Sequence, residues 1–395
     1  MSNRHPRLKL RPGAHKRLKF GHPWVYSNEV DMEPATKALP PGSVVTVTDA
    51  GGGVLATAHF NPRTLIAARV LAAPDIAIDR AFIVELLKQA LALRERLFDR
   101  PYYRLVHAEA DGLPGLIVDR FADACVIQPN SAGMDAASAD IAAALAEVVG
   151  AKTVILRGDN SARCLEGLAE EVRGLVGSVT GPVPVEENGV TFYADLQSGQ
   201  KTGWFFDQRD NHAFMASLAK GASVLDLYTH TGGFALPAAR AGATRVLGVD
   251  RSQPALDLAT KGADANRVTE TCAFERAEVF SFLEAALARK ATWDVVIADP
   301  PPFIKSKKDQ KAGLQGYRKL ARLCAGVTAP GGFLFIASCS HNAPVEEFTE
   351  AVARGLEDAS RHGRIIRTAG AGPDHPVHPK LPESAYLKAV VLQLD

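Results

Sequence analysis

Strand and helix patterns alternate from about Lys220 to the end of the chain, and this alternation constrains the fold more than any other feature. Short apolar runs such as "SVLDLY", "RVLGVD", "WDVVIADPP" and "FLFIAS" are separated by helical patterns such as "FALPAARAG" and "PALDLATKGADAN". Such alternation predicts an α/β fold with a mostly parallel, doubly wound sheet and helices on both faces. Ligands bind to such sheets beyond the carboxyl ends of the strands, so the loops that follow the strands are the candidate site.

Two further regions precede this alternation. Residues 7–72 read as short strands joined by turns, with a glycine-rich hairpin at 49–53, and predict a small β-rich domain. Residues 79–177 combine the helical pattern "AFIVELLKQALALRERLF" with strand patterns such as "KTVILRG", which predicts a middle α/β domain. Asn188-Gly189 stands between alternating apolar residues and predicts a β-hairpin. We therefore expect three domains, at 1–74, 79–177 and 183–395, the last beginning with that hairpin.

The net charge of the 395-residue chain is only +1, but its basic residues are unevenly distributed. Within residues 1–30 a single acid, Glu29, stands among seven basic residues: Arg4, Arg7, Lys9, Arg11, Lys16, Arg17 and Lys19. A second cluster contains Lys305, Lys307, Lys308 and Lys311. Local basic patches attract phosphate backbones even when the net charge is near zero, so both clusters are candidate contacts for a phosphate backbone. A solvated, disordered arm is the alternative for the first cluster.

Composition disfavours several other classes of protein. No apolar stretch approaches the roughly 20 residues that span a bilayer, and the first residues lack the apolar segment of a signal peptide. The five cysteines are odd in number, scattered and without a metal-type C-x-x-C spacing. They favour a reduced cytoplasmic enzyme, without a metal site, over a disulfide scaffold.

Polar residues stand where the strands of the alternating region end. In "VLDLYTHTGGFAL", Gly232-Gly233 lets the backbone turn tightly towards a ligand, and Asp226 lies at the end of the preceding strand. Asp250 ends the second strand about 20 residues beyond the loop, where a carboxylate can accept both ribose hydroxyls. Later strand ends add Glu278, which can contact an adenine edge, and Asp299 of "ADPPPF". Because the loop is not G-x-G-x-x-G, this set favours S-adenosylmethionine over a nicotinamide cofactor.

These motifs together resemble those of the RlmI-like family of bacterial methyltransferases, which form 5-methylcytosine in 23S ribosomal RNA of the large subunit. The resemblance covers nearly the whole chain. It rests on "GHPWVYSNEV", "ADGLPGLIVDRF", "KTGWFFDQRDNH", "LDLYTHTGGFAL", "DPPPFIKSKKDQ", "SCSH" and "LPESAYLKA". Two departures are a third proline after Asp299, where the family has lysine, and Glu278, where aspartate is more usual. The resemblance implies an N-terminal PUA domain that binds RNA, a class I methyltransferase domain with a Rossmann-like sheet, and a homodimer as a plausible assembly.

The resemblance also implies a set of cofactor contacts. The residues expected to hold S-adenosylmethionine are Asp226, Tyr228, Thr229, Thr231, Gly232, Gly233, Asp250, Arg251, Glu278 and Asp299. The connector "WFFDQRDN" precedes the first strand of the alternating region, and four of its residues are expected to close over the cofactor: Phe205, Asp207, Gln208 and Arg209. A segment that packs between domains is the alternative for this connector, because domain junctions also hold aromatic residues.

Methylation of cytosine C5 needs a nucleophile, because C5 itself is a poor one. A thiolate that adds to C6 activates C5, and a polar partner holds the ring edge. Cys339 follows the apolar run "FLFIAS" and has a polar flank, unlike Cys324 in "LARLCAGV", which reads as core. The resemblance then identifies "SCS" with the nucleophile position. We expect Cys339 and Asp299 to be catalytic.

Further residues are expected to contact RNA. They are Arg11, Lys16 and Lys19 near the start of the chain, and Phe303, Lys305, Lys307 and Lys308 beside the extruded base. Phe303 is expected to stack on a base, and core packing is the alternative for it.

Three alternatives stay open. A methyltransferase acting on an exocyclic amino group needs no covalent nucleophile, and the related guanine-N7 type lacks a cysteine in the segment that matches "SCS". Cys339 argues against both. A catalytically silent RNA-binding protein is opposed by the intact "DLYTHTGG" and "DPPPF". Titration with the cofactor separates that alternative from an enzyme.

Overall fold

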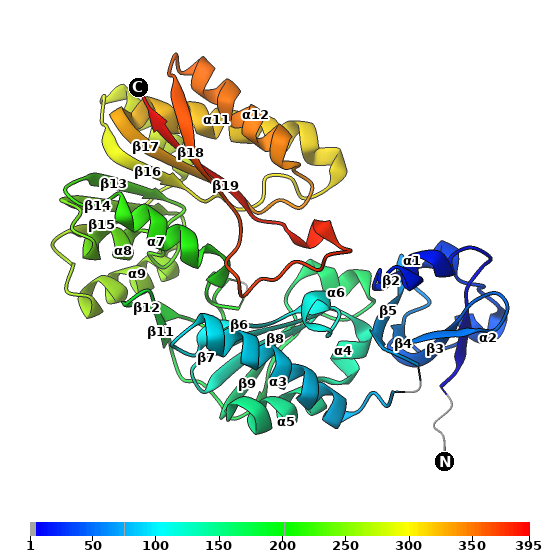
Figure 1. The fold of residues 1–395 in the computed structure, drawn as a ribbon. Coiled ribbons are helices and arrows are strands. Elements are labelled where there is room, and N and C mark those ends of the chain that lie inside the picture. The colour runs from blue at the N-terminus through cyan, green and yellow to red at the C-terminus, as the bar shows by residue number, and fades with distance from the viewer. Residues whose placement is uncertain (1–4, 75, 201) are drawn as a thin grey trace. The chain divides into compact units, whose positions relative to one another are not determined.

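The computed structural model describes residues 5–74, 76–200 and 202–395 (Figure 1). Arg4 of the first basic cluster and Lys201, which opens "KTGWFFDQRDNH", lie outside the described residues. The chain forms two compact units. The first contains residues 1–181, 195–204 and 373–384, and the second contains residues 182–194, 205–372 and 385–395.

The first unit begins with a five-stranded sheet in the order β1-β3-β4-β5-β2. Its strands are β1 (Arg7–Lys9), β2 (Trp24–Tyr26), β3 (Ser43–Thr48), β4 (Val54–Phe60) and β5 (Ile66–Ala72), with the short helices α1 (His15–Lys19) and α2 (Pro34–Lys37). The predicted hairpin at 49–53 joins β3 to β4, and the Asp49 carboxylate accepts hydrogen bonds from the backbone N–H groups of Gly51 and Gly53. The strand pattern of residues 7–72 is thereby confirmed.

The second sheet of this unit has the order β10-β9-β8-β7-β6. The strands are β6 (Tyr102–His107), β7 (Leu116–Phe121), β8 (Ala124–Pro129), β9 (Thr153–Arg157) and β10 (Val172–Val176). The helices are α3 (Arg80–Leu97), α4 (Ala132–Ala136), α5 (Ser138–Val149) and α6 (Ser161–Leu165). The predicted helix at 81–98 is α3, which is capped by Asp79 and buries Leu87 against this sheet. The alanine-rich segment at 132–149 is interrupted at Ala137, which separates α4 from α5.

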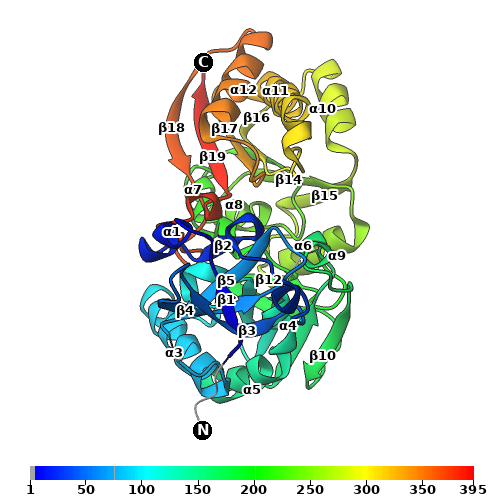
Figure 2. The ribbon, with the colours of Figure 1, turned by 90° about the vertical axis from the view of Figure 1, so that its right-hand side faces the viewer.

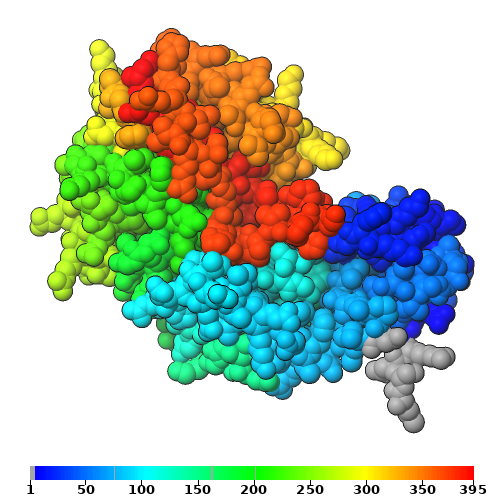
Figure 3. Space-filling view, viewed as in Figure 1, coloured from blue at the N-terminus to red at the C-terminus, as the bar shows by residue number. Residues whose placement is uncertain are grey.

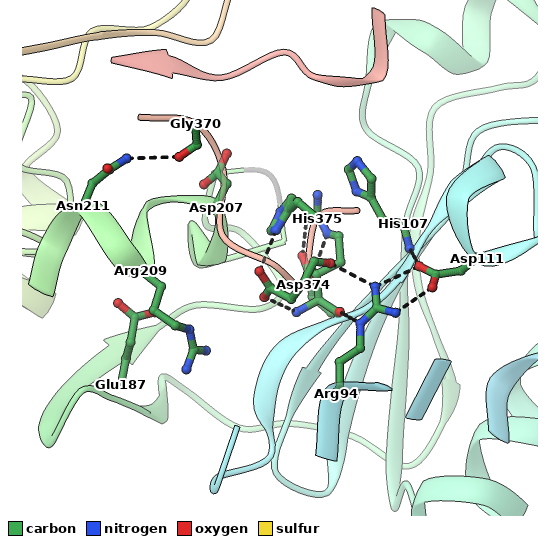
Figure 4. Close-up of polar contacts among 12 residues, drawn as sticks. Arg94, His107, Asp111, Glu187, Asp207, Arg209, Asn211, Gly370, Asp374 and His375 are labelled. Atoms are coloured by element: carbon green, nitrogen blue, oxygen red, sulfur yellow. Dashed lines mark hydrogen bonds and ion pairs between the residues drawn. The ribbon is translucent and has the colours of Figure 1, made fainter. Parts of the chain in front are cut away.

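A buried arginine ties residues 373–384 to this unit. The Arg94 guanidinium is fully buried and donates to both carboxylate oxygens of Asp111, at 2.6 and 2.8 Å (Figure 4). It also donates to the carbonyl of Asp374 at 2.9 Å, while the Asp374 carboxylate accepts from the backbone N–H of Arg104 at 3.0 Å. Removing one partner from a buried ion pair is costly, so these bonds hold the segment in place.

The second unit contains a seven-stranded sheet in the order β15-β14-β13-β16-β17-β19-β18. Its strands are β13 (Ser223–Leu227), β14 (Arg245–Asp250), β15 (Cys272–Arg276), β16 (Trp293–Ala298), β17 (Thr328–Ser338), β18 (Gly363–Ala369) and β19 (Lys388–Leu394). The first five pair in parallel, and β19 runs antiparallel between β17 and β18. Figure 2 shows β18 and β19 at one edge of the sheet. The predicted doubly wound, Rossmann-like sheet is confirmed.

Helices cover both faces of this sheet. They are α7 (Arg209–Ser217), α8 (Ala235–Arg240), α9 (Gln253–Ala265), α10 (Val279–Ala288), α11 (Gln310–Val327) and α12 (Val345–Asp358). The first three lie on one face (Figure 1), and α10, α11 and α12 pack together on the other (Figure 2). The hairpin of β11 (Val183–Glu187) and β12 (Val190–Ala194) turns at Asn188 and Gly189, whose φ angles are +52° and +75°. Two positive φ angles match the turn that Asn-Gly favours, which confirms the predicted hairpin.

The core of the second unit contains residues from its central parallel strands and from α11. Leu225, Val296 and Ile336 are fully buried in neighbouring parallel strands. Cys324 is fully buried in α11, as predicted. The strand β17 is longer than the predicted "FLFIAS", since it begins at Thr328 and passes Gly331 at a φ of +75°. Its end at Ser338 agrees with the prediction, so Cys339 is the first residue beyond the strand.

Among the described residues, no helix is both long and apolar enough to cross a bilayer. The same residues contain no group of three or more histidine, cysteine, aspartate or glutamate side chains arranged to hold a metal ion.

Candidate active site

The loop after β13 has an unusual backbone. Tyr228 and His230 have positive φ angles of +62° and +51°, and Gly232 has a φ of +85°. Residues other than glycine rarely adopt positive φ, and such positions cluster at functional sites where the surrounding structure holds them. The loop is held by Asp226, whose Oδ2 accepts from the Thr229 hydroxyl at 2.5 Å and from the backbone N–H of Ala235 at 3.0 Å.

The other carboxylate oxygen of Asp226 has no hydrogen-bond partner among the described residues. The side chain is fully buried, and burial raises the pKa of its carboxyl to about 7. A buried polar atom without a partner is uncommon and often marks a place that a ligand or water completes. Asp226 therefore offers an acceptor at the point where the sequence places the cofactor.

Asp250 lies at the carboxyl end of the neighbouring strand. Its Oδ2 accepts from the backbone N–H of His230 at 3.0 Å, and its Oδ1 accepts from the backbone N–H of Ser252 at 2.9 Å. Each carboxylate oxygen can accept a second bond, so the pair keeps capacity for two ribose hydroxyls. The Phe205 ring meets the His230 ring edge-on, with centroids 4.9 Å apart, which places this connector residue beside the loop.

Three other residues that the sequence predicts to bind the cofactor also contact other groups of the protein. Glu278 caps α10 by accepting from the Ser281 backbone N–H at 3.0 Å. Thr231 is buried, and its hydroxyl lies 3.4 Å from His230 Nδ1. Arg251 has an exposed side chain, and its backbone carbonyl accepts from Arg276 at 3.2 Å. Of these three, Glu278 and Arg251 lie at the surface, and their contacts with the cofactor stay a prediction.

The connector residues Asp207, Gln208 and Arg209 are buried in the second unit. The backbone carbonyl of Asp207 accepts from Gly372 at 3.1 Å, and its carboxylate accepts from the Tyr386 hydroxyl at 2.5 Å. Gln208 accepts from the Asn211 amide at 2.7 Å, and that amide also points to the Gly370 carbonyl in Figure 4. Within the connector, Phe205 contacts the loop after β13 through the ring of His230.

Arg209 lies opposite a buried carboxylate. Its Nε is 3.8 Å from Oε2 of Glu187, and both side chains are almost fully buried (Figure 4). Burial and this pairing show a structural role for the predicted cofactor residue. The cofactor role of Arg209 stays a prediction.

Asp299 and Phe303 follow β16. The register of β16 and β17 pairs Ala298 with Ile336, so Asp299 lies opposite Ala337. Cys339 comes two residues after Ala337, just beyond the end of β17. The Phe303 ring packs on Tyr317 with centroids 4.7 Å apart. That contact agrees with the core-packing alternative, while the ring is still partly exposed.

Cys339 lies in a polar turn. It is partly exposed, whereas Cys125, Cys272 and Cys324 are buried and Cys164 is exposed on the first unit. Burial raises the thiol pKa of Cys125 and Cys272 to about 12, and that of Cys324 still further. Reactive cysteines need partial exposure in an environment that favours the thiolate, so Cys339 is the best candidate in the second unit.

Sequence reasoning missed Lys388, which lies in the quoted "LPESAYLKA" but received no role. Its Nζ donates to the carbonyls of Ser340 and Ala343, at 2.6 and 2.7 Å. Its antiparallel pairing opposite Ser338 brings it to the cysteine turn. No sequence spacing could place it there, because it lies 48 residues beyond Ser340.

The predicted RNA-contacting lysines are all exposed. In the second unit, Lys305, Lys307 and Lys308 surround a turn in which Ser306 and Asp309 bond to each other. In the first unit, Lys16 and Lys19 project from α1, and Arg11 is exposed with its Nε bonded to the Val30 carbonyl.

The first basic cluster gains one residue from the end of the chain. Lys380 lies beside Gly21, 3.9 Å from the position that a Cβ atom would take there. Figure 3 shows this segment, in orange-red, against the dark blue surface of residues near the start of the chain. The exposed Phe20 stands next to Gly21 on this basic surface.

Family models match two parts of the chain. A PUA-like domain matches residues 8–73, and an S-adenosylmethionine-dependent methyltransferase matches residues 170–393. The buried unpaired oxygen of Asp226 and the remaining capacity of Asp250 fit this cofactor. The cofactor predicted from the sequence is thereby confirmed.

Curated relatives match nearly the whole chain. The chain is 34% identical to ribosomal RNA large subunit methyltransferase I of Pseudoalteromonas atlantica, over 98% of this chain and 99% of the relative. It is 37% identical to the protein of the same name from Aliivibrio fischeri, over 96% and 97% of the two chains.

Solved structures share the fold. A SAM-dependent methyltransferase from Streptococcus mutans superposes with a TM-score of 0.81 at 21% identity, over 98% of this chain and 100% of that chain. The methyltransferase SMU.776, complexed with SAH, gives a TM-score of 0.83 at 20% identity over the same shares. With the full-length relatives and the family model, these findings show that the chain belongs to the ribosomal RNA large subunit methyltransferase I family of S-adenosylmethionine-dependent methyltransferases.

Proposed function

We propose that this protein methylates C5 of a cytosine in ribosomal RNA of the large subunit, with Cys339 as the covalent nucleophile. One observation carries the proposal: a partly exposed cysteine stands directly beyond β17, on the same rim as Asp299 and the loop after β13. The names of the relatives support the RNA class, and the PUA-like domain supports RNA binding.

The proposed reaction begins with the Cys339 thiolate. Its Sγ forms a bond to C6, and the electron pair of the C5–C6 double bond moves onto C5. Asp299 holds the ring edge by accepting a hydrogen bond from the exocyclic amino group. S-adenosylmethionine, when bound, would supply the electrophilic methyl group that C5 takes, with the electron pair of the broken S–CH₃ bond staying on sulfur in the departing S-adenosylhomocysteine. A base then removes the C5 proton, the pair left behind re-forms the double bond, and Cys339 leaves as the thiolate.

The residues that bind RNA are proposed to divide into two groups. The basic surface around α1 (Lys16, Lys19 and Lys380) and the exposed Lys305, Lys307 and Lys308 contact phosphates, which position the RNA without reading its sequence. We propose cytoplasmic action on the cysteine usage and a homodimer on the family resemblance alone, and light scattering tests the assembly.

The decisive experiment traps the adduct. Large-subunit ribosomal RNA transcribed with 5-fluorocytidine should form a covalent complex with the protein in the presence of S-adenosylmethionine, because fluorine at C5 cannot leave as a proton. Peptide mass spectrometry should place the adduct on Cys339. A variant with Cys324→Ala should still trap RNA, because the Cys324 thiol is fully buried.

Mapping the RNA distinguishes the rival reactions. Mass spectrometry of ribosomal RNA from cells with and without the protein should show 5-methylcytosine lost at a defined site. A methylated exocyclic amino group or a 7-methylguanine lost instead, together with full activity of Cys339→Ala, would overturn the proposal.

A further inference from the structure

Lys388 is a buried lysine held by two backbone carbonyls. Its side chain is only 7% exposed, and its Nζ donates to Ser340 and Ala343 at 2.6 and 2.7 Å. Burial lowers the pKa of the Lys388 ammonium, so the fold keeps a cation where burial disfavours one. Charged groups are rarely buried unless a partner requires them.

The two carbonyls belong to the turn that begins at Cys339. The Ser340 carbonyl also accepts from the Ala343 backbone N–H at 3.1 Å, which closes the turn. The Ser340 hydroxyl accepts from Ile304 N–H at 3.3 Å and lies 3.0 Å from the Tyr317 hydroxyl. The turn is therefore fixed on both sides, by Lys388 and by α11. A nucleophile needs such fixed geometry.

An ammonium has three N–H donors, and the two carbonyls accept from two of them. A negatively charged Cys339 favours the charged form of Lys388. Because the interaction is mutual, the ammonium equally favours the thiolate of Cys339. A nearby cation is one of the environments that make a cysteine reactive.

We propose that Lys388 is the positioning residue of Cys339: it fixes the turn after β17 and stabilises the cysteine as the thiolate. The role that this gives to the thiolate rests on the proposed function. Two substitutions of Lys388 separate its charge from its shape. Lys388→Arg keeps the positive charge but not the compact geometry of the ammonium, and Lys388→Met fills a similar volume without charge.

Four further titratable groups belong to residues of the turn or of the segments that lead to it. They come from the end of β16, from α11, from the turn itself and from the segment before β19: Asp299, Tyr317, His341 and Tyr386. Burial raises the pKa of the Tyr317 phenol, which keeps it neutral. The His341 ring lies 5.3 Å from the Tyr386 ring, and Tyr386 donates to Asp207. Lys388 is the one primary amine among these side chains.

The experiment measures the reactivity of Cys339 without RNA or turnover. The full-length protein is alkylated with iodoacetamide between about pH 5.5 and 9.5, and the labelled Cys339 and Cys164 peptides are quantified by mass spectrometry. The exposed Cys164 is the internal reference. We expect the midpoint of Cys339 about one unit or more below the ordinary value of about 8.5, and Lys388→Met should return it to that value. Its rate near pH 7 should then fall about tenfold, with Cys164 unchanged, and Lys388→Arg should retain the low midpoint.

Two results would overturn the proposal. One is a wild-type midpoint at or above about 8.5, which decides the matter even if Lys388→Met does not fold. The other is an equal midpoint in wild type and a folded Lys388→Met, with folding checked by thermal unfolding and by binding of S-adenosylhomocysteine. Full methylation by Cys339→Ala would instead refute the proposed function, and the alkylation profile would still decide the effect of Lys388.

Discussion

The rim of the sheet in the second unit has two halves that are built differently. At the ends of β13 and β14, Asp226 and Asp250 accept hydrogen bonds from the backbone of the next loop or helix, so the carboxylates are in place without a ligand. At the ends of β16 and β17, the polar groups are a partly exposed thiol and a buried ammonium that arrives from β19. The first half is suited to hold a cofactor, and the second half is suited to hold a reacting group. Variants that affect one half and spare the other test this division.

The largest effect is expected for Cys339→Ala. Loss of the nucleophile should reduce methylation of large-subunit ribosomal RNA to background, because C5 is not activated without the thiolate. Binding of S-adenosylhomocysteine, measured by calorimetry, should stay within about twofold, since the altered side chain belongs to the other half of the rim. Cys324→Ala is the matched control for chemistry and should retain activity. A large loss of binding in Cys339→Ala would show that the two halves are not separable.

A pH-dependent effect on stability comes next, at Asp226. Below about pH 4 the carboxyl is protonated in both the folded and the unfolded chain. Between about pH 4 and the folded-state pKa of about 7, Asp226 loses its proton in the unfolded chain but keeps it in the folded chain. The free energy of unfolding therefore falls as the pH rises through this range. The three-unit difference corresponds to at most about 4 kcal/mol. In urea unfolding without ligand, Asp226→Asn should remove this fall in stability. A parallel pH dependence of wild type and variant would show that Asp226 is ionised in the folded protein.

Asp250→Ala should produce a smaller loss, confined to the cofactor half. Hydrogen bonds to charged groups contribute about 1.5–3 kcal/mol, so the affinity for S-adenosylhomocysteine should fall about 10- to 100-fold. The pH profile of Cys339 alkylation should not change. Glu278→Gln is the comparison, because it keeps an oxygen that can cap α10. Unchanged binding by Asp250→Ala would remove this carboxylate from the cofactor site.

The two halves also differ in how far the sequence alone could predict them. The loop after β13 and Asp250 lie within or directly after short motifs, so strand–helix alternation placed them correctly on one rim. The same reasoning placed Cys339 at the end of β17, because β17 ends at Ser338. The Lys388 contact depends on the antiparallel pairing of β19 with β17, and no local pattern reports which distant strand pairs with which.

The sequence motifs also could not predict which of their side chains are buried. The family motif containing Gln208 and Arg209 suggested cofactor contacts, while the structure shows both side chains buried against protein groups. Phe303 likewise packs on Tyr317, which a linear pattern cannot distinguish from an exposed aromatic residue. Sequence motifs therefore predicted which segments meet at the rim, whereas the protein contacts of the individual side chains depend on residues distant in the sequence.

The smallest expected effects concern the exposed lysines, whose contribution should be electrostatic and spread over many phosphates. Each lysine that no longer neutralises a phosphate should lower the slope of log affinity against log salt by roughly one unit. A triple change of Lys305, Lys307 and Lys308 to Gln should therefore lower the slope by up to about three, and Lys16→Gln with Lys19→Gln by up to about two. These five side chains are exposed and lie away from the buried cores, so stability and binding of S-adenosylhomocysteine should hardly change. Filter binding of ribosomal RNA at several salt concentrations measures both slopes. An unchanged slope in one set, with the expected change in the other, would assign phosphate binding to one of the two basic clusters alone.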